Sequence, residues 1–300
     1  MNTDKVKNII IILLAVLNAA LFVLLMAEFG RFRLGGGHVA AIRVLFEQND
    51  IAITADIPRN FRPQRVLYVQ PFVHDRYAHA EVFFPGGANQ TPEVWGRITF
   101  FDGDETLEIT GLYLGNYVLT YTNETGFSTT EFLYRSFDDY DAVLRLADEF
   151  VRRITPPGLM FVHTYTNVFY DDEFATLWFR GYYGGYIIRD NQIRISISNN
   201  GIFWAQLNFA NIPHGFSRER REIISADEAL FVVLHHLTPM YEENEVVVYA
   251  ISMAYFMPDL ADSPTGEELI TATPCYRIVV EIDGIKQTFW VDAFTNERLD

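Results

Sequence analysis

The chain has 300 residues, a formal net charge of −16 and a hydrophobic content of 49%. The acidic charge repels nucleic acid, so the sequence predicts no nucleic-acid partner. Cys275 is the only cysteine, which excludes an intramolecular disulfide, and a core of apolar side chains must therefore stabilise the fold.

The first predicted element is an uncharged apolar run, residues 9–27 (IIIILLAVLNAALFVLLMA). A run of this length is typical of a transmembrane helix, because roughly 20 apolar residues cross the hydrocarbon core of a bilayer. We therefore expect a cytoplasmic tail at 1–8, a single-pass anchor in the cell membrane at 9–27 and a linker at 28–37. The bulk of the chain would then be extracytoplasmic. A cleaved signal peptide is the alternative.

One polar side chain, Asn18, lies in the middle of this run. Ala15, Asn18, Ala19 and Phe22 recur at helical spacing and share one face of the predicted helix. Small residues four positions apart let two helices approach closely, and an amide at this depth can form a hydrogen bond to a second helix. The sequence predicts that this face contacts a partner helix. The alternative is that the run simply tolerates one Asn.

The rest of the chain predicts an α+β fold with two domains of mainly antiparallel sheet and packed helices, at 38–155 and 159–300. Thr155-Pro-Pro-Gly158 is the expected boundary between them. Helices are expected from His38, from Ser136, and from the capping box Ser225-Ala-Asp-Glu228 to Leu237. The expected strands are Val66–Val69, Ala80–Phe84, Arg97–Phe101, Thr106–Thr110, Tyr117–Tyr121, Thr130–Tyr134, Phe161–Tyr170, Phe174–Arg180, Tyr186–Arg189, Gln192–Ser198, Ile202–Asn208, Glu245–Met257, Tyr276–Ile282 and Ile285–Val291.

Motifs that carry catalysis, metal binding or phosphate binding are absent from the sequence. The carboxylate clusters Asp138-Asp139-Asp141 and Asp171-Asp172-Glu173 lack the spacing and the glycine of a calcium loop. We therefore expect that the protein is not an enzyme and that it has no cofactor and no metal site. The densest aromatic patch contains Tyr182, Tyr183 and Tyr186, which could stack on sugar rings or a peptide, or could pack within a sheet.

Four stretches together resemble YycI-type proteins of Gram-positive bacteria, which are single-pass accessory proteins of a cell-wall-sensing histidine kinase. They are DKVKNIIIILLAVLNAALFVLL (4–25), VLFEQNDIAITADIPRNFRPQRVLYV (44–69), ISADEAL (224–230) and FWVDAFTNERL (289–299). Pro274-Cys-Tyr276 and Thr295-Asn296-Glu297 depart from the family pattern.

The resemblance implies a non-catalytic regulator that binds the sensor histidine kinase and a sister regulatory protein (YycH-type), and that restrains the kinase. The alternative function is an anchored cell-surface binding module for wall glycan or peptide, similar to PepSY modules, without a kinase partner.

Overall fold

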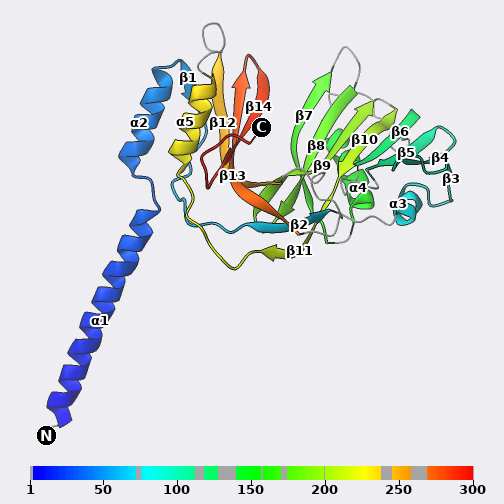
Figure 1. Ribbon diagram of the computed structural model, residues 1–300. Coiled ribbons are helices and arrows are strands. Elements are labelled where there is room, and N and C mark those ends of the chain that lie inside the picture. Colours follow the sequence, from blue (N-terminus) through cyan, green and yellow to red (C-terminus); the bar gives the residue numbers. More distant parts are fainter. Residues whose placement is uncertain are drawn as a thin grey trace. The chain divides into compact units, whose positions relative to one another are not determined.

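The computed structural model describes residues 3–71, 76–111, 118–127, 140–156, 158–169, 174–198, 200–237, 245–257 and 269–299. The chain forms two compact units, each assembled from separate stretches of sequence (Figure 1). Unit 1 contains residues 1–64, 221–252 and 276–300, and unit 2 contains residues 65–220 and 253–275. This division does not follow the expected boundary at 156–158, which lies within unit 2.

The described residues of unit 1 form three helices and a small sheet. The helices are α1 (Thr3–Arg31), α2 (Gly36–Glu47) and α5 (Ala226–Leu237). The strands are β1 (Ile51–Ile53), β14 (Ile285–Asp292), and the parts of β12 (Val246–Phe256) and β13 (Ile270–Ile282) that belong to this unit. β1 pairs with β12 in parallel, and β13 pairs with β14.

The structure contradicts the prediction of a transmembrane helix at residues 9–27. Among the described residues, no helix is both long enough and apolar enough to cross a bilayer. The fold class with a membrane-spanning helix is therefore wrong in that element, and the single-pass membrane localisation is not supported.

Unit 2 is built around one large antiparallel sheet. Its strands lie in the order β7, β8, β9, β10, β6, β5, β4, β3. Their bounds are β3 (Asn89–Gln90), β4 (Ile98–Asp102), β5 (Glu105–Thr110), β6 (Val118–Phe127), β7 (Phe161–Phe169), β8 (Phe174–Tyr183), β9 (Tyr186–Ser198) and β10 (Gly201–Asn208).

Two helices, α3 (Arg76–Phe83) and α4 (Tyr140–Ile154), cover one face of this sheet (Figure 1). Their buried side chains pack against alternate residues of the strands, including Leu107, Leu119 and Ile195. Strand side chains alternate between faces, so the residues between these buried positions lie on the opposite face of the sheet.

The remaining strands of unit 2 form a smaller ladder. β2 (Leu67–Pro71) lies between β11 (Ala210–Phe216) and residues 270–272 of β13, and both pairings are antiparallel. Residues 254–255 of β12 pair in parallel with β9. A second apolar cluster containing Leu67, Val69 and Tyr255 packs here.

Several expected elements differ from those observed. Ala80–Phe84 was expected as a strand but belongs mostly to helix α3, in which His79, Ala80 and Phe83 are buried at helical spacing. β9 continues through Asp190-Asn191, where a turn was expected. The expected strand Thr130–Tyr134 lies outside the described residues.

Candidate binding sites

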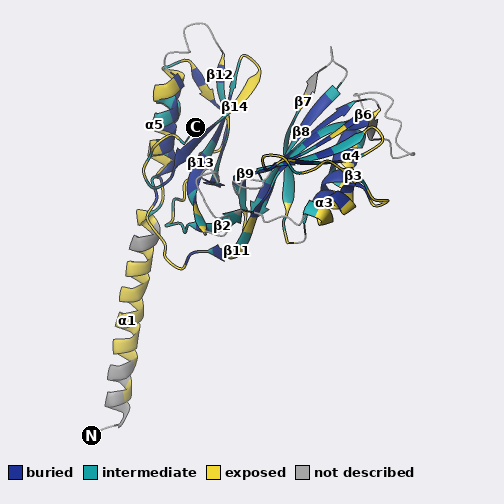
Figure 2. Ribbon diagram, turned by 45° about the vertical axis from the view of Figure 1, so that its right-hand side comes forward, coloured by how far each residue is buried: buried dark blue, intermediate teal, exposed yellow. Residues whose placement is uncertain are grey.

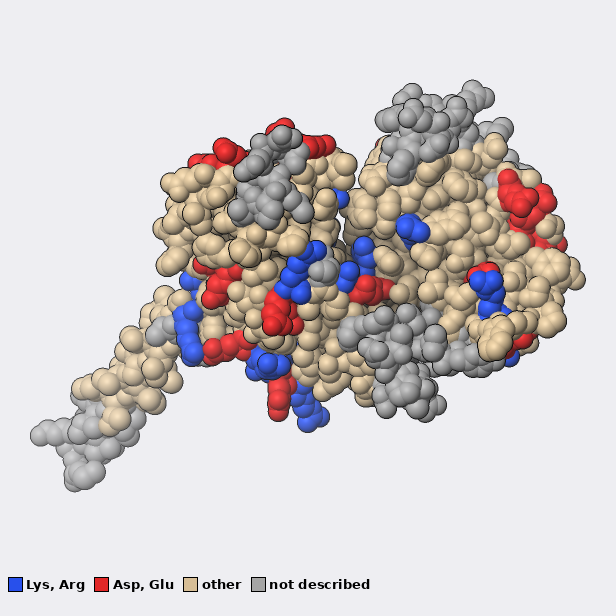
Figure 3. All heavy atoms as spheres, turned by 45° about the horizontal axis from the view of Figure 1, so that its top comes forward, with Lys and Arg blue, Asp and Glu red and all other residues tan. Residues whose placement is uncertain are grey.

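The predicted partner-contact face lies on α1. The described side chains from Ile11 to Met26 are all exposed, and they include Phe22 at 62% and Leu24 at 65% (Figure 2). The side-chain amide of Asn18 has no hydrogen-bond partner among the described residues. Figure 3 shows no acidic or basic side chain on this stretch of the helix. The structure thus leaves Ala15, Asn18, Ala19 and Phe22 open to contact another molecule.

The predicted surface aromatics lie at the hairpin that joins β8 to β9. Tyr183 and Tyr186 pack against Phe216, with ring centroids 5.5 and 6.1 Å apart. Tyr186 also lies 5.4 Å from Tyr255, a buried residue. The sequence analysis singled out neither Phe216 nor Tyr255, because each comes from a strand distant in sequence.

Glycine makes this packing possible. Gly184 has a φ of +57°, and a Cβ at this position would lie 2.5 Å from a ring carbon of Phe216. A Cβ at Gly215, which has a φ of +64°, would lie 2.6 Å from the Tyr183 hydroxyl. Tyr183 and Tyr186 therefore hold the hairpin against the smaller ladder, and only Tyr182 has no ring contact of this kind among the described residues.

A cavity of about 630 Å³ lies beside the C-terminal end of α4 and the start of β7. Its lining is mostly apolar, with Leu144, Val151 and Met160, and it also contains Asp148, Arg152 and His163. The volume is within the range of small-molecule sites. No motif in the sequence signals this cavity, because it forms where the segment after α4 turns into β7.

Of the titratable side chains that line the cavity, His163 is the one whose ordinary pKa lies nearest to pH 7. Its Nε2 lies 2.9 Å from the Thr166 hydroxyl, and its ring packs edge-on against Phe179. Burial lowers the pKa of His163, while a backbone hydrogen bond at Tyr165 and the Asp148 carboxylate act in the opposite direction. The imidazole is therefore neutral at pH 7 and can donate one hydrogen bond and accept another.

A polar cluster lies under α4. The buried Asn123 amide donates to Glu105 Oε1 at 3.1 Å and to the Tyr121 hydroxyl at 3.4 Å. Burial raises the pKa of Glu105, and the hydrogen bond with Tyr121 and the charge of Arg153 oppose that shift. These contacts satisfy polar groups beside the core.

Within the described ranges, no three His, Cys, Asp or Glu side chains lie close enough together to hold a metal ion. The clusters Asp138-Asp139 and Asp171-Asp172-Glu173 fall outside those ranges. Cys275 is buried.

The comparisons with known proteins assign no family. No protein-family model matches the chain, and no curated protein matches it. Similar solved structures include an uncharacterized protein from Eubacterium rectale, with 10% identity, a TM-score of 0.49, and coverage of 84% of this chain and 91% of that chain. The C-terminal domain of Bacillus megaterium YpeB has 12% identity, a TM-score of 0.39, and coverage of 76% and 96%. Both TM-scores are below 0.5, and neither likeness assigns a function. The resemblance to YycI-type regulators depends on the sequence motifs alone.

Proposed function

We propose that the chain is a non-catalytic regulator that associates with a sensor histidine kinase through α1. The observation that carries this proposal is the exposure of every described side chain from Ile11 to Met26. Contiguous apolar surface of this kind marks an interaction site, because each Å² removed from water stabilises a complex by about 25 cal/mol. The motifs shared with YycI-type proteins support a kinase, and a sister regulator, as the partners.

The composition of one α1 face supports contact with a helix. Ala15 and Ala19 have small side chains that allow a second helix to pack closely, and Asn18 can add an interhelical hydrogen bond of roughly 1 kcal/mol. A regulator of this kind shifts the active–inactive equilibrium of the kinase only by binding one state more tightly than the other. If it restrains the kinase, α1 binds the inactive state better.

Photo-crosslinking in cells tests this proposal. A benzophenone amino acid replaces Phe22 on the predicted face, and in a matched control it replaces Leu24, which lies on the opposite side of α1 and is equally exposed. We expect a crosslink to a sensor histidine kinase from position 22 that is much weaker from position 24. Equal crosslinking from both positions, or no protein crosslinked from position 22, would overturn the proposal.

The regulatory part has its own test. Asn18→Leu keeps the apolar surface but removes the amide, so we expect weaker co-purification with the kinase and higher output from a reporter of the kinase. Unchanged association together with unchanged reporter output would refute the role of Asn18.

A further inference from the structure

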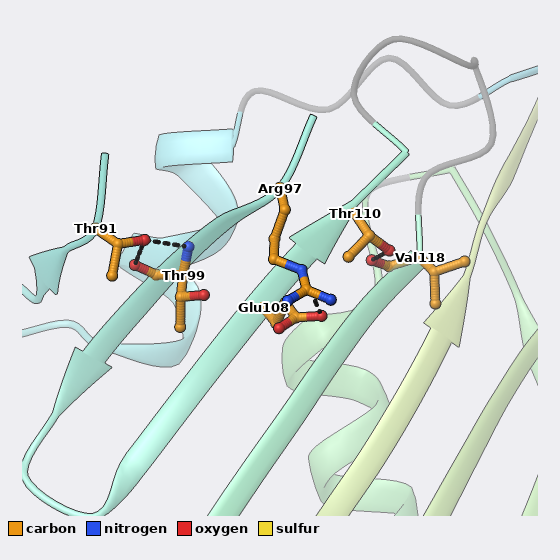
Figure 4. A network of polar contacts seen from close by, with 6 residues as sticks. All are labelled: Thr91, Arg97, Thr99, Glu108, Thr110 and Val118. Atoms are coloured by element: carbon orange, nitrogen blue, oxygen red, sulfur yellow. Dashed lines mark hydrogen bonds and ion pairs between the residues drawn. The ribbon is translucent and has the colours of Figure 1, made fainter. Parts of the chain in front are cut away.

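The large unit 2 sheet has a second face, opposite the one that α3 and α4 cover, and we call it the open face. Figure 4 shows Arg97, Thr99, Glu108 and Thr110 on this open face, with the helices behind the strands. The side chains of the open face are mostly half-exposed, in contrast to the fully buried residues that alternate with them. The open face is therefore a surface available to a ligand within unit 2.

The strand register aligns one residue from each of seven neighbouring strands in a row across the open face. Each member of the row is the direct cross-strand partner of the next. The row consists of Tyr165, Trp178, Arg194, Gln206, Thr120, Glu108 and Thr99.

Aromatic rings gather at the β7–β10 end of the row. The Trp178 ring stacks on Tyr165, with centroids 4.4 Å apart and an interplanar angle of 13°. Trp204, in the adjacent row, lies under the guanidinium of Arg194 at 4.4 Å. β8 and β10 are separated by β9, so Trp178 and Trp204 lie two strand spacings, roughly 10 Å, apart across the sheet and are also offset by one row along the strands. Two indoles separated in this way can each pack against a different ring of an extended oligosaccharide.

The charge on this end of the row is positive. Arg194 forms no ion pair with any described carboxylate, whereas Glu108 is already paired with Arg97 at 3.4 Å. Arg180 lies in the next row and donates to Gln192 Oε1 at 2.5 Å. In a chain of net charge −16, an uncompensated guanidinium between two tryptophans is complementary to a carboxylate.

We propose that the open face binds an acidic oligosaccharide. Arg194 holds a sugar carboxylate, the indoles of Trp178 and Trp204 pack against the apolar faces of the sugar rings, and Gln206 and Thr120 exchange hydrogen bonds with hydroxyl groups. The site is separate from α1, so it does not depend on the kinase partner.

Titration of the full chain with oligogalacturonate, followed by tryptophan fluorescence and calorimetry, tests the proposal. The neutral methyl ester of the same oligosaccharide and hexaglutamate are the comparison ligands. We expect saturable binding of the acid and at least about tenfold weaker binding of the ester, because a hydrogen bond to a charged group is lost. Equal affinity for acid and ester, tighter binding of hexaglutamate, or no binding of the acid would overturn the proposal.

Variants assign the binding to the open face. Arg194→Gln should weaken the acid at least about tenfold while leaving the ester unchanged, and Trp204→Ala should weaken both ligands. Arg97→Gln is the matched control, since it removes an arginine of the same face that is already paired, and it should bind the acid as the wild type does. Circular dichroism checks that each variant is folded. An effect of Arg97→Gln equal to that of Arg194→Gln would place the ligand elsewhere.

Discussion

Replacing Tyr255 by Phe removes a single hydroxyl group from inside unit 2. The Tyr255 hydroxyl donates to the Arg65 carbonyl at 2.7 Å, and its ring, which is 1% exposed, packs against Tyr186 and Phe216. Phe keeps these ring contacts, so the variant loses only the hydrogen bond and leaves the carbonyl without this donor. We expect the free energy of unfolding to fall by about 1–2 kcal/mol. Urea denaturation followed by circular dichroism measures this change.

Two matched variants test the reasoning. Tyr276 has the same arrangement in unit 1, where its hydroxyl donates to the Ile224 carbonyl at 2.9 Å, so Tyr276→Phe should cost a similar amount. Tyr249 is 48% exposed, and Tyr249→Phe should change stability by less than about 0.5 kcal/mol. A Tyr255→Phe protein as stable as the wild type, or one no less stable than Tyr249→Phe, would refute the argument.

The same residue makes stability depend on alkaline pH. Burial raises the pKa of Tyr255, so the folded chain keeps a proton that the unfolded chain releases above about pH 10. The wild type therefore loses stability as pH rises above 10, because the unfolded state then binds fewer protons than the folded state. Tyr255→Phe should reduce this loss. Urea denaturation at several pH values between 9 and 11 gives the free energy of unfolding as a function of pH, and the same dependence in the variant and the wild type would contradict the prediction.

Three further predictions concern unit 2. Gly184→Ala should destabilise the protein more than Gly103→Ala, because both positions have a φ near +60° but only Gly184 has a ring carbon 2.5 Å from the added Cβ; equal melting temperatures would contradict this. Burial lowers the pKa of His163, so wild-type stability should fall as pH decreases below 6.5, and His163→Gln should flatten that dependence in urea titrations from pH 7 to pH 5. Burial raises the pKa of Glu105, so the folded protein loses stability as the pH increases above 4.5. Glu105→Gln should therefore stabilise the protein relative to the wild type, and by more at pH 7 than at pH 5. A variant whose stability depends on pH as that of the wild type does would exclude this effect.

Elements set by neighbouring residues were predictable from the sequence. The capping box that opens α5 is confirmed, since the Ser225 backbone N–H donates to Glu228 Oε2 at 2.7 Å. The turn at Asp283-Gly284 is also confirmed, with both residues at positive φ. Helix α4 lies in the segment where a helix was expected from Ser136, and its buried residues, which include Val143, Ala147 and Phe150, recur at helical spacing. Each of these signals acts within a few residues, so one sequence contains it completely.

Features that depend on long-range packing were not predictable. A short apolar run such as Ala80–Phe84 fits a strand and a buried helix equally well, and only its contacts in the core decide between them. β11 contains Pro213 and Gly215, which weaken any strand signal. The row on the open face requires the register of seven strands, whereas alternation within one strand shows only which side chains share a face. The cavity beside His163 is different, since one stretch of sequence, residues 144–163, supplies its lining, but its shape depends on how the chain turns between α4 and β7.

The discontinuous units also constrain how the chain can fold during synthesis. Unit 2 requires residues 253–275 and unit 1 requires residues 276–300, so the ribosome must synthesise residue 275 before unit 2 has all its parts and continue beyond it to complete unit 1. Until then, the nascent chain displays long unpaired strand edges, which are prone to aggregation. A stop codon after residue 275 would remove β14 and more than half of β13, and would leave α2 and α5 without these strands of the unit 1 sheet.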